Sequence, residues 1–134
     1  MMELCRAAIQ AMKQSYSPYS DFKVGAALLT KDGKIYTGCN IENASFSVTV
    51  CAERTAIFKA VSEGETEFAM LAIAGGKNGK LQGEVPPCGV CRQVLREFAD
   101  PTQMTVIVCK SVDDYKEMTL EQLLPESFGP DNLT

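Results

Sequence analysis

The sequence has 134 residues, and because a domain usually has roughly 100–200 residues, we expect residues 1–134 to form a single domain. Hydrophobic residues make up 46% and charged residues 22% of the chain, values that exclude an intrinsically disordered protein. With 13 Lys and Arg against 17 Asp and Glu, the net charge of −4 argues against a nucleic-acid polymer as the main ligand.

Apolar residues at helical spacing predict an amphipathic helix over residues 3–15. The nearly unbroken apolar run 24–30 is typical of a strand that is covered on both faces. Asp32 and Gly33 predict a hairpin turn into a strand over 35–39, because glycine tolerates a positive φ.

The next elements alternate between helix and strand. We expect a helix over 51–63 that stops at Gly64, followed by a strand over 68–74. Four glycines and two prolines predict a loop over 75–87, and a second apolar stripe predicts a helix over 89–99.

A further strand is predicted over 104–109, and Thr119 with Gln122 resembles a capping box that opens a short helix. The order strand–helix–strand–helix–strand over 35–109 predicts two crossovers and parallel pairing. The first hairpin adds an antiparallel strand. The pattern therefore predicts a three-layer α/β fold with a mixed sheet.

The chain has six cysteines and no histidine, which excludes catalysis that depends on Ser-His-Asp or Cys-His. No apolar run reaches the roughly 18–20 residues of a membrane span, and residues 1–6 lack the layout of a signal peptide. We therefore expect a cytoplasmic protein with no membrane partner. In that compartment, clustered thiols indicate metal binding, redox chemistry or core packing.

Cys88 and Cys91 form a CxxC motif at the predicted start of a helix. This motif alone fits half of a zinc site or a redox pair, because both use thiolates stabilised at a helix N-terminus. Cys51 opens another predicted helix, and Glu53 lies two residues after it. Three cysteines with an open fourth position are typical of a catalytic zinc, and Glu53 is placed to reach a water there without binding the metal.

Together, C-A-E and P-C-x-x-C match the zinc-dependent deaminases. The chain resembles the small homotetrameric cytidine deaminases in six segments that occur in the same order: S-P-Y-S at 17–20, F-K-V-G-A-A-L-L at 22–29, G-C-N-I-E-N-A-S at 38–45, C-A-E-R-T-A at 51–56, P-C-G-V-C-R-Q-V at 87–94 and L-L-P-E-S-F-G-P at 123–130. The resemblance implies a three-layer α/β/α sandwich with a mixed five-stranded sheet.

The resemblance also implies roles at the site. Zinc, one ion per subunit, would be held by Cys51, Cys88 and Cys91, and Glu53 would move protons between water and the cytosine ring. The side chain of Arg54, and with it that of Arg92, is expected to donate hydrogen bonds to sulfur and so offset the charge of three thiolates.

The implied substrate is a free pyrimidine nucleoside, cytidine or 2′-deoxycytidine. Asn40 and Glu42 resemble the pair that holds the ribose hydroxyls, and a carboxylate there suits a sugar without phosphate. Phe22 resembles the residue that stacks on the pyrimidine. The other residues that the resemblance assigns to substrate binding are Ala44, Phe46, Ala52 and Phe128, with Phe128 contributed by a neighbouring subunit of a homotetramer.

One position departs from the family pattern. Phe46 stands where the family usually has tyrosine, at a subunit interface beside the neighbour's ligand, and Ser47 follows where glycine or proline is common. We expect an altered affinity or sugar preference but the same reaction. Cys5, Cys39 and Cys109 match no ligand spacing and are expected to be small buried hydrophobic residues.

Three other functions remain open from the sequence. The first is deamination of another aminopyrimidine nucleoside, such as a nucleoside antibiotic. The second is a zinc-stabilised module without catalysis. The third is a thiol oxidoreductase, which would depend on Cys88 and Cys91 but not on Cys51 or zinc.

Overall fold

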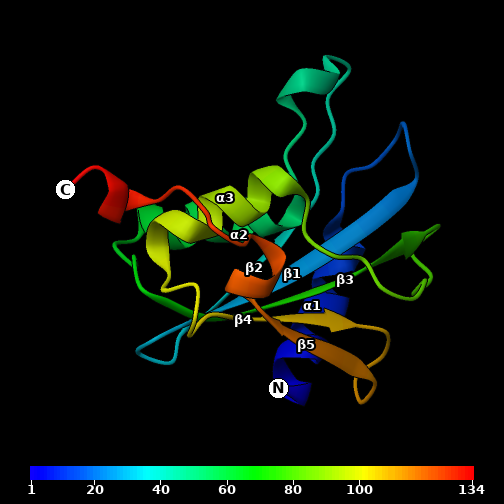
Figure 1. Ribbon diagram of the computed structural model, residues 1–134. Coiled ribbons are helices and arrows are strands. Elements are labelled where there is room, and N and C mark those ends of the chain that lie inside the picture. The colour runs from blue at the N-terminus through cyan, green and yellow to red at the C-terminus, as the bar shows by residue number, and fades with distance from the viewer.

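The computed structural model describes residues 1–134 and contains one five-stranded sheet in the order β2-β1-β3-β4-β5 (Figure 1). The elements in chain order are α1 (Met2–Ala11), a 3₁₀ turn (Met12–Gln14), β1 (Phe22–Thr30), β2 (Ile35–Cys39), a 3₁₀ turn (Phe46–Val48), α2 (Ala52–Ser62), β3 (Phe68–Lys77), α3 (Gly89–Phe98), β4 (Thr105–Cys109), β5 (Tyr115–Thr119), α4 (Leu120–Leu123) and a 3₁₀ turn (Pro130–Asn132).

Most predicted elements are confirmed, with differences at their ends. The first helix tightens into a 3₁₀ turn after Ala11, and β3 continues to Lys77, three residues beyond its predicted end. Gly64 follows α2 with a φ of +93°, and the Thr119 capping box is present. The pattern did not predict β5, because its central residues are exposed and charged and so lack the apolar signature of a strand.

The strand pairing corrects one expectation. Two parallel pairs were expected over 35–109, but only β3 and β4 pair in parallel. Strands β2 and β3 run in the same direction, yet β1 lies between them and pairs antiparallel with both. The reason is that the hairpin occupies one edge of β1 and leaves its other edge free for β3. The crossover through α2 therefore passes over β1.

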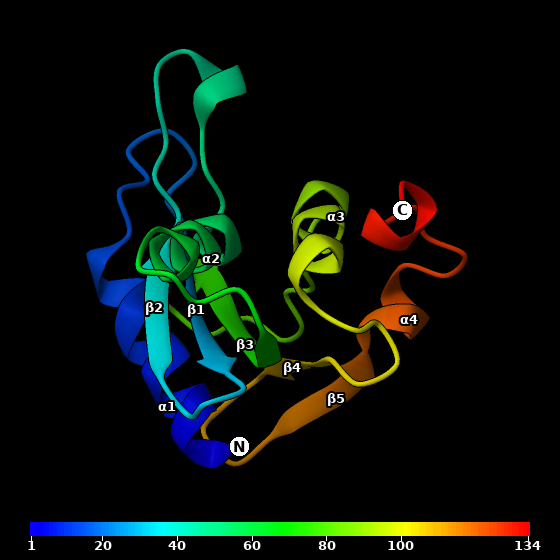
Figure 2. The same ribbon diagram turned by 90° about the vertical axis from the view of Figure 1, so that its left-hand side faces the viewer.

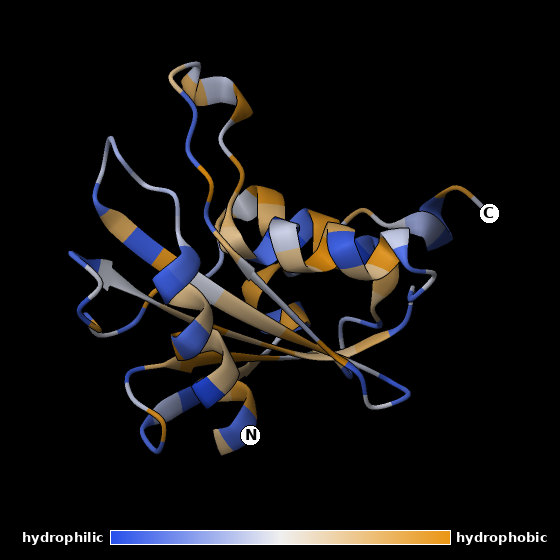
Figure 3. Ribbon diagram, turned by 180° about the vertical axis from the view of Figure 1, so that it is seen from behind, coloured by the Kyte–Doolittle hydropathy of each residue, from blue (hydrophilic) through white to orange (hydrophobic).

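Helices cover both faces of the sheet, with α1 on one face and α2, α3 and α4 on the other (Figure 2). Successive residues of β1 point to opposite faces: Ala26 and Leu28 pack with α2 and α3, whereas Ala27 packs with α1. In Figure 3, which is coloured by hydropathy, the central strands are mostly apolar, whereas α1 contains both polar and apolar residues. The three-layer α/β/α sandwich is confirmed.

Two of the three cysteines outside the ligand spacing lie in the core between α1 and β4. Cys5 and Cys109 are buried free thiols, the Cys109 thiol donates a hydrogen bond to the Cys5 sulfur at 2.7 Å, and burial raises the pKa of Cys109. Cys39 is only half-buried, so the expectation that it would be buried is wrong. It ends β2, where the sheet is covered less completely.

None of the helices combines the length and the apolar character that crossing a membrane requires.

We expect Gly25→Ala to lower the free energy of unfolding by about 1–3 kcal/mol, because overpacking displaces neighbouring backbone. A methyl group at Gly25 would lie 2.1 Å from the Ala8 carbonyl oxygen and 2.6 Å from the Met12 nitrogen, so α1 would have to move off the sheet. Urea unfolding measures the loss. Gly89→Ala is the control, since a methyl group there meets no atom within 4 Å; equal stability of the two variants would contradict the assignment.

Candidate active site

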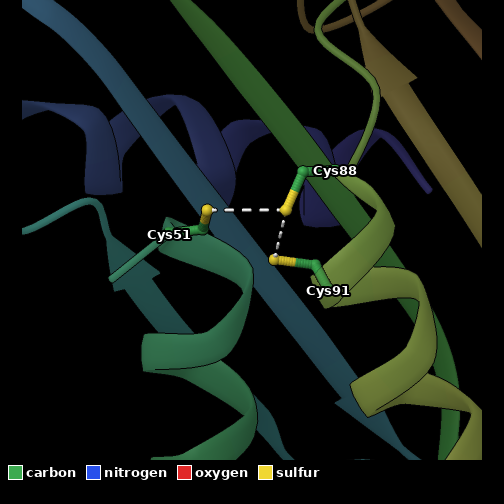
Figure 4. A group of neighbouring side chains, drawn as sticks. All are labelled: Cys51, Cys88 and Cys91. Carbon is green, nitrogen blue, oxygen red and sulfur yellow. Dashed lines mark hydrogen bonds between the residues drawn. The ribbon is translucent and has the colours of Figure 1, made fainter. Parts of the chain in front are cut away.

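Three cysteine sulfurs come together where α2 and α3 begin (Figure 4). Cys51 precedes the first residue of α2, Cys88 precedes the first residue of α3, and Cys91 lies in the first turn of α3. The Cys88 sulfur lies 3.8 Å from that of Cys51 and 3.5 Å from that of Cys91, and all three lie within 4.8 Å of one another. The structure thus joins two segments that are 37 residues apart.

These sulfurs fit a zinc ion. With Zn–S bonds of about 2.3 Å, tetrahedral geometry separates two thiolate ligands by about 3.8 Å, close to the spacing found here. The N-termini of α2 and α3 both face the cluster, and the positive ends of their dipoles stabilise thiolates. Three protein ligands leave a fourth position for a water or a substrate, as in catalytic rather than structural zinc sites.

Arg54 lies against the cluster. Its Nη2 atom donates a hydrogen bond to the Cys51 sulfur at 3.4 Å, while its buried Nε has no partner in the protein. Without metal, hydrogen bonding from Cys91, supported by Arg54, lowers the pKa of Cys51 to about 5. The pKa of Cys91 is raised, because its thiol shares a proton with the Cys51 thiolate and is buried. The site therefore favours negative charge on sulfur.

Arg92 has different partners from those expected. Its Nε donates to the Pro87 carbonyl at 2.8 Å, and its Nη1 donates to the Leu123 carbonyl at 2.7 Å. The expectation that Arg92 would donate to a sulfur is therefore corrected: its hydrogen bonds go to carbonyl groups and tie the segment before Cys88 to α4. Spacing along the chain does not distinguish a sulfur acceptor from a carbonyl acceptor at the same helix end.

Glu53 is almost completely buried, with 4% of its surface exposed, and lies in the first turn of α2. Burial raises its pKa to about 7 in the metal-free protein, and the nearby Cys51 thiolate adds to the shift. A carboxyl group with this pKa can accept and return a proton near neutral pH. It lines a cavity together with Val24, Asn40, Cys51, Ala52, Val85, Pro86 and Cys88.

Asn40 lies in that cavity and also braces the start of β1. Its Oδ1 accepts a hydrogen bond from the Val24 amide at 2.9 Å, and its Nδ2 donates to the Phe22 carbonyl at 2.8 Å. A side-chain amide has two N–H groups, so one remains for a ligand.

Glu42 lies in a second cavity, lined also by Tyr19, Ser20, Phe46 and Thr49. Its carboxylate accepts hydrogen bonds from the backbone amides of Tyr19 and Ser20 at 3.0 and 3.1 Å and from the Ser20 hydroxyl. The Ser20 hydroxyl bond is the main reason that the pKa of Glu42 is lowered. Sequence reasoning assigned no role to Ser20, although it belongs to the S-P-Y-S segment on which the resemblance was based.

The remaining expected substrate residues range from buried to largely exposed. Ala52 is buried beside the sulfurs, and Phe22 is half-buried at the start of β1. Ala44 and Phe46 belong to the segment between β2 and α2, where Phe46 begins the 3₁₀ turn, and this segment projects from the body of the protein at the top of Figure 1. Phe46 is 72% exposed and Phe128 is 59% exposed, and neither ring lines the cavity that contains Glu53.

The fold and the sulfur cluster define a zinc-binding α/β protein with an open metal position. Residues 2–109 match the family described as "Cytidine and deoxycytidylate deaminase zinc-binding region". The chain is 49% identical over 125 residues to a cytidine deaminase from Sporosarcina psychrophila, covering 93% of this chain and 88% of that protein. It is 45% identical over 130 residues to a cytidine deaminase from Halalkalibacterium halodurans, covering 97% and 95% respectively.

A solved structure agrees with these relatives. The crystal structure of cytidine deaminase from Burkholderia pseudomallei superposes with a TM-score of 0.85 at 44% sequence identity, covering 94% of this chain and 97% of that one. The chain therefore belongs to the cytidine and deoxycytidylate deaminase zinc-binding family. The fold class and the zinc cofactor expected from the sequence are confirmed.

We expect Cys88→Ser to reduce the zinc content of the purified protein from about one ion per chain to near zero, because a serine hydroxyl is not a zinc ligand of this type. Cys39→Ser is the matched control, since Cys39 lies at the end of β2 outside the sulfur cluster. Metal analysis by mass spectrometry measures both. Equal zinc loss in the two variants would contradict the ligand assignment.

In the metal-free protein, we expect the stability of the wild type to fall relative to that of Glu53→Gln between about pH 4.5 and pH 7. The pKa of Glu53 is raised from 4.5 to about 7 in the folded state, so the unfolded chain releases this proton first and higher pH favours unfolding. The difference in free energy of unfolding should grow by roughly 3 kcal/mol. Urea unfolding with a chelator present measures it, and a pH-independent difference would contradict the prediction.

Proposed function

We propose that this protein catalyses the hydrolytic deamination of cytidine and 2′-deoxycytidine to uridine and 2′-deoxyuridine, with release of ammonia. The observation that carries the proposal is the buried carboxyl group of Glu53 beside three sulfurs that fit zinc with a fourth position open. The named relatives are cytidine deaminases and align over nearly the whole chain.

Cys51, Cys88 and Cys91 would hold the metal. Zinc with three protein ligands supplies a water that loses a proton near neutral pH. Arg54 offsets part of the negative charge of the three thiolates, which would otherwise weaken the pull of the metal on that water.

Glu53 moves the protons of the reaction. It first accepts a proton from the attacking water and passes it to N3 of the cytosine ring while the oxygen bonds to C4. It then takes the second proton of the former water from the hydroxyl group on C4 and delivers it to the amino group, so that the C4–N bond breaks and ammonia leaves as the C4 carbonyl forms. Burial, which raises its pKa to about 7 in the metal-free protein, favours a carboxyl group that can both accept and donate a proton. Water is consumed and ammonia is released, so the atoms balance.

The substrate is held by residues from both cavities. Asn40, with one free N–H, and Glu42, with its carboxylate, bind the ribose hydroxyls, and Phe22 stacks on the pyrimidine. Ala52 and Ala44 belong to the same binding surface. A carboxylate at the sugar disfavours a nucleoside phosphate by charge repulsion.

A homotetramer with shared active sites completes the proposal. Its support is the apolar surface that a single chain leaves exposed: Phe46, Val48 and Phe128 are all more than half exposed. Phe46 and Phe128 would then contact the ligand of a neighbouring subunit.

The same proposal includes a cytoplasmic role in pyrimidine salvage, with residues 1–134 forming a single domain. The cytoplasm is reducing, and a reducing compartment keeps the cysteine ligands as thiolates.

The test compares the zinc-loaded wild type with Glu53→Gln and with Glu63→Gln, an exposed acid at the end of the same helix. Wild type and Glu63→Gln should release ammonia and uridine from cytidine. Glu53→Gln should keep its zinc and its affinity for the product but lose at least about 10²–10⁴-fold in turnover. A wild type inactive on every aminopyrimidine nucleoside, or an active Glu53→Gln, would overturn the proposal.

A further inference from the structure

The segment around Phe128 is fixed to α3 by a buried arginine. Arg96, in the last turn of α3, is 9% exposed. Its Nε donates to the Ser127 hydroxyl at 2.8 Å, and its Nη2 forms an ion pair with the Asp131 carboxylate at 2.6 Å. Figure 2 shows the segment lying alongside α3. We call these contacts of Arg96 with residues 127–131 the Arg96 clamp.

Gly129 allows the guanidinium group to lie directly against the backbone. A methyl group at this position would lie 2.3 Å from the Arg96 Cζ atom and 2.4 Å from its Nη1 atom. The φ of Gly129 is −153°, which any residue can adopt, so the need for glycine comes from the close approach of Arg96 and not from backbone strain.

The clamp fixes the backbone of Phe128 and leaves its ring free. The Phe128 carbonyl accepts a hydrogen bond from the Gln93 side chain at 2.9 Å, and the residues on both sides contact Arg96. The phenyl ring is nevertheless 59% exposed. An exposed aromatic ring on a rigid backbone loses little conformational entropy when it binds, which is a property of residues that dominate interfaces.

We propose that Arg96 is a positioning residue that holds Phe128 in the conformation in which its ring closes the nucleoside cavity of a second copy of this chain. This inference rests on the proposed function. It assigns Arg96 an effect on substrate binding through Phe128, with no contact between Arg96 and the substrate. Because α3 also carries Cys91, the clamp links the position of the ring to the helix that holds the metal.

The decisive variants weaken the clamp without touching the metal site. Arg96→Gln removes the ion pair, and Asp131→Asn does the same from a side chain that is 72% exposed, so the second variant is expected to fold. Both should raise the KM for cytidine about threefold to tenfold and leave kcat within about twofold and zinc content unchanged. Arg96→Lys, which keeps the charge but not the planar fork, should give an intermediate KM.

Two further measurements separate positioning from general destabilisation. Hydrogen exchange should become faster at the backbone amides of residues 127–133 in Asp131→Asn, with α2 and the sheet unchanged. The double variant Asp131→Asn/Phe128→Ala should have the KM of Phe128→Ala alone, because the clamp acts only through that ring. Lys34→Gln, which breaks a surface ion pair with Glu65, is the control and should match the wild type.

An unchanged KM in Asp131→Asn and Arg96→Gln, or a KM increase of the same factor in the Phe128→Ala background, would overturn the inference. Each of these results would be obtained with a wild type that deaminates cytidine, so they leave the proposed function intact. A wild type without that activity contradicts the proposed function instead, and the hydrogen-exchange comparison then still tests whether the clamp orders residues 127–133.

Discussion

The close packing of α2 against the sheet is the constraint on which the site depends. At Gly38 in β2, a methyl group would lie 2.5 Å from the Ala56 nitrogen and 2.6 Å from the Ala52 carbonyl oxygen. The helix backbone therefore rests directly on the strand, and its first residue is held at a fixed height above the sheet. This contact sets the position of Cys51 relative to Cys88 and Cys91 at the start of α3. A metal that requires ligands within a few tenths of an ångström depends on that fixed position.

The same packing explains the chemistry of Glu53. Because the first turn of α2 packs on the sheet with the start of α3 beside it, a residue two positions after Cys51 is removed from water almost completely. Burial penalises the charged carboxylate, so its pKa rises toward neutrality, where it can both accept and donate a proton. The neighbouring carboxylate of Glu42 has the opposite environment: several donors surround it, and it stays ionised. Two glutamates eleven positions apart therefore have opposite pKa shifts, which supports the different roles proposed for them.

Polar side chains away from the metal connect the parts of the site. Asn40 ties β1 to the residues that follow β2, Arg92 ties the segment before Cys88 to α4, and Arg96 ties α3 to residues 127–131. Each donates to or accepts from backbone or side-chain groups that are distant in sequence. These bonds stabilise the relative positions of loops that the sheet itself does not hold.

The sequence by itself determined the local properties of this protein. Periodicity set the helices and most strands, Thr119 and Gly64 marked helix ends, and the types and spacing of Cys51, Glu53 and the CxxC motif indicated zinc chemistry. The helix, strand and capping signals depend on residues close to one another in the chain, whereas the zinc motif combines two short segments 37 positions apart that were matched together through the family resemblance. Only the tertiary structure decided which strand lies beside β1, that Arg92 bonds to carbonyl groups, and that Asn40 and Glu42 line different cavities. Each of these features requires contact between segments that are far apart in the sequence. Such contacts form only when all the helices and strands pack together around the core, so local patterns in the sequence do not predict them.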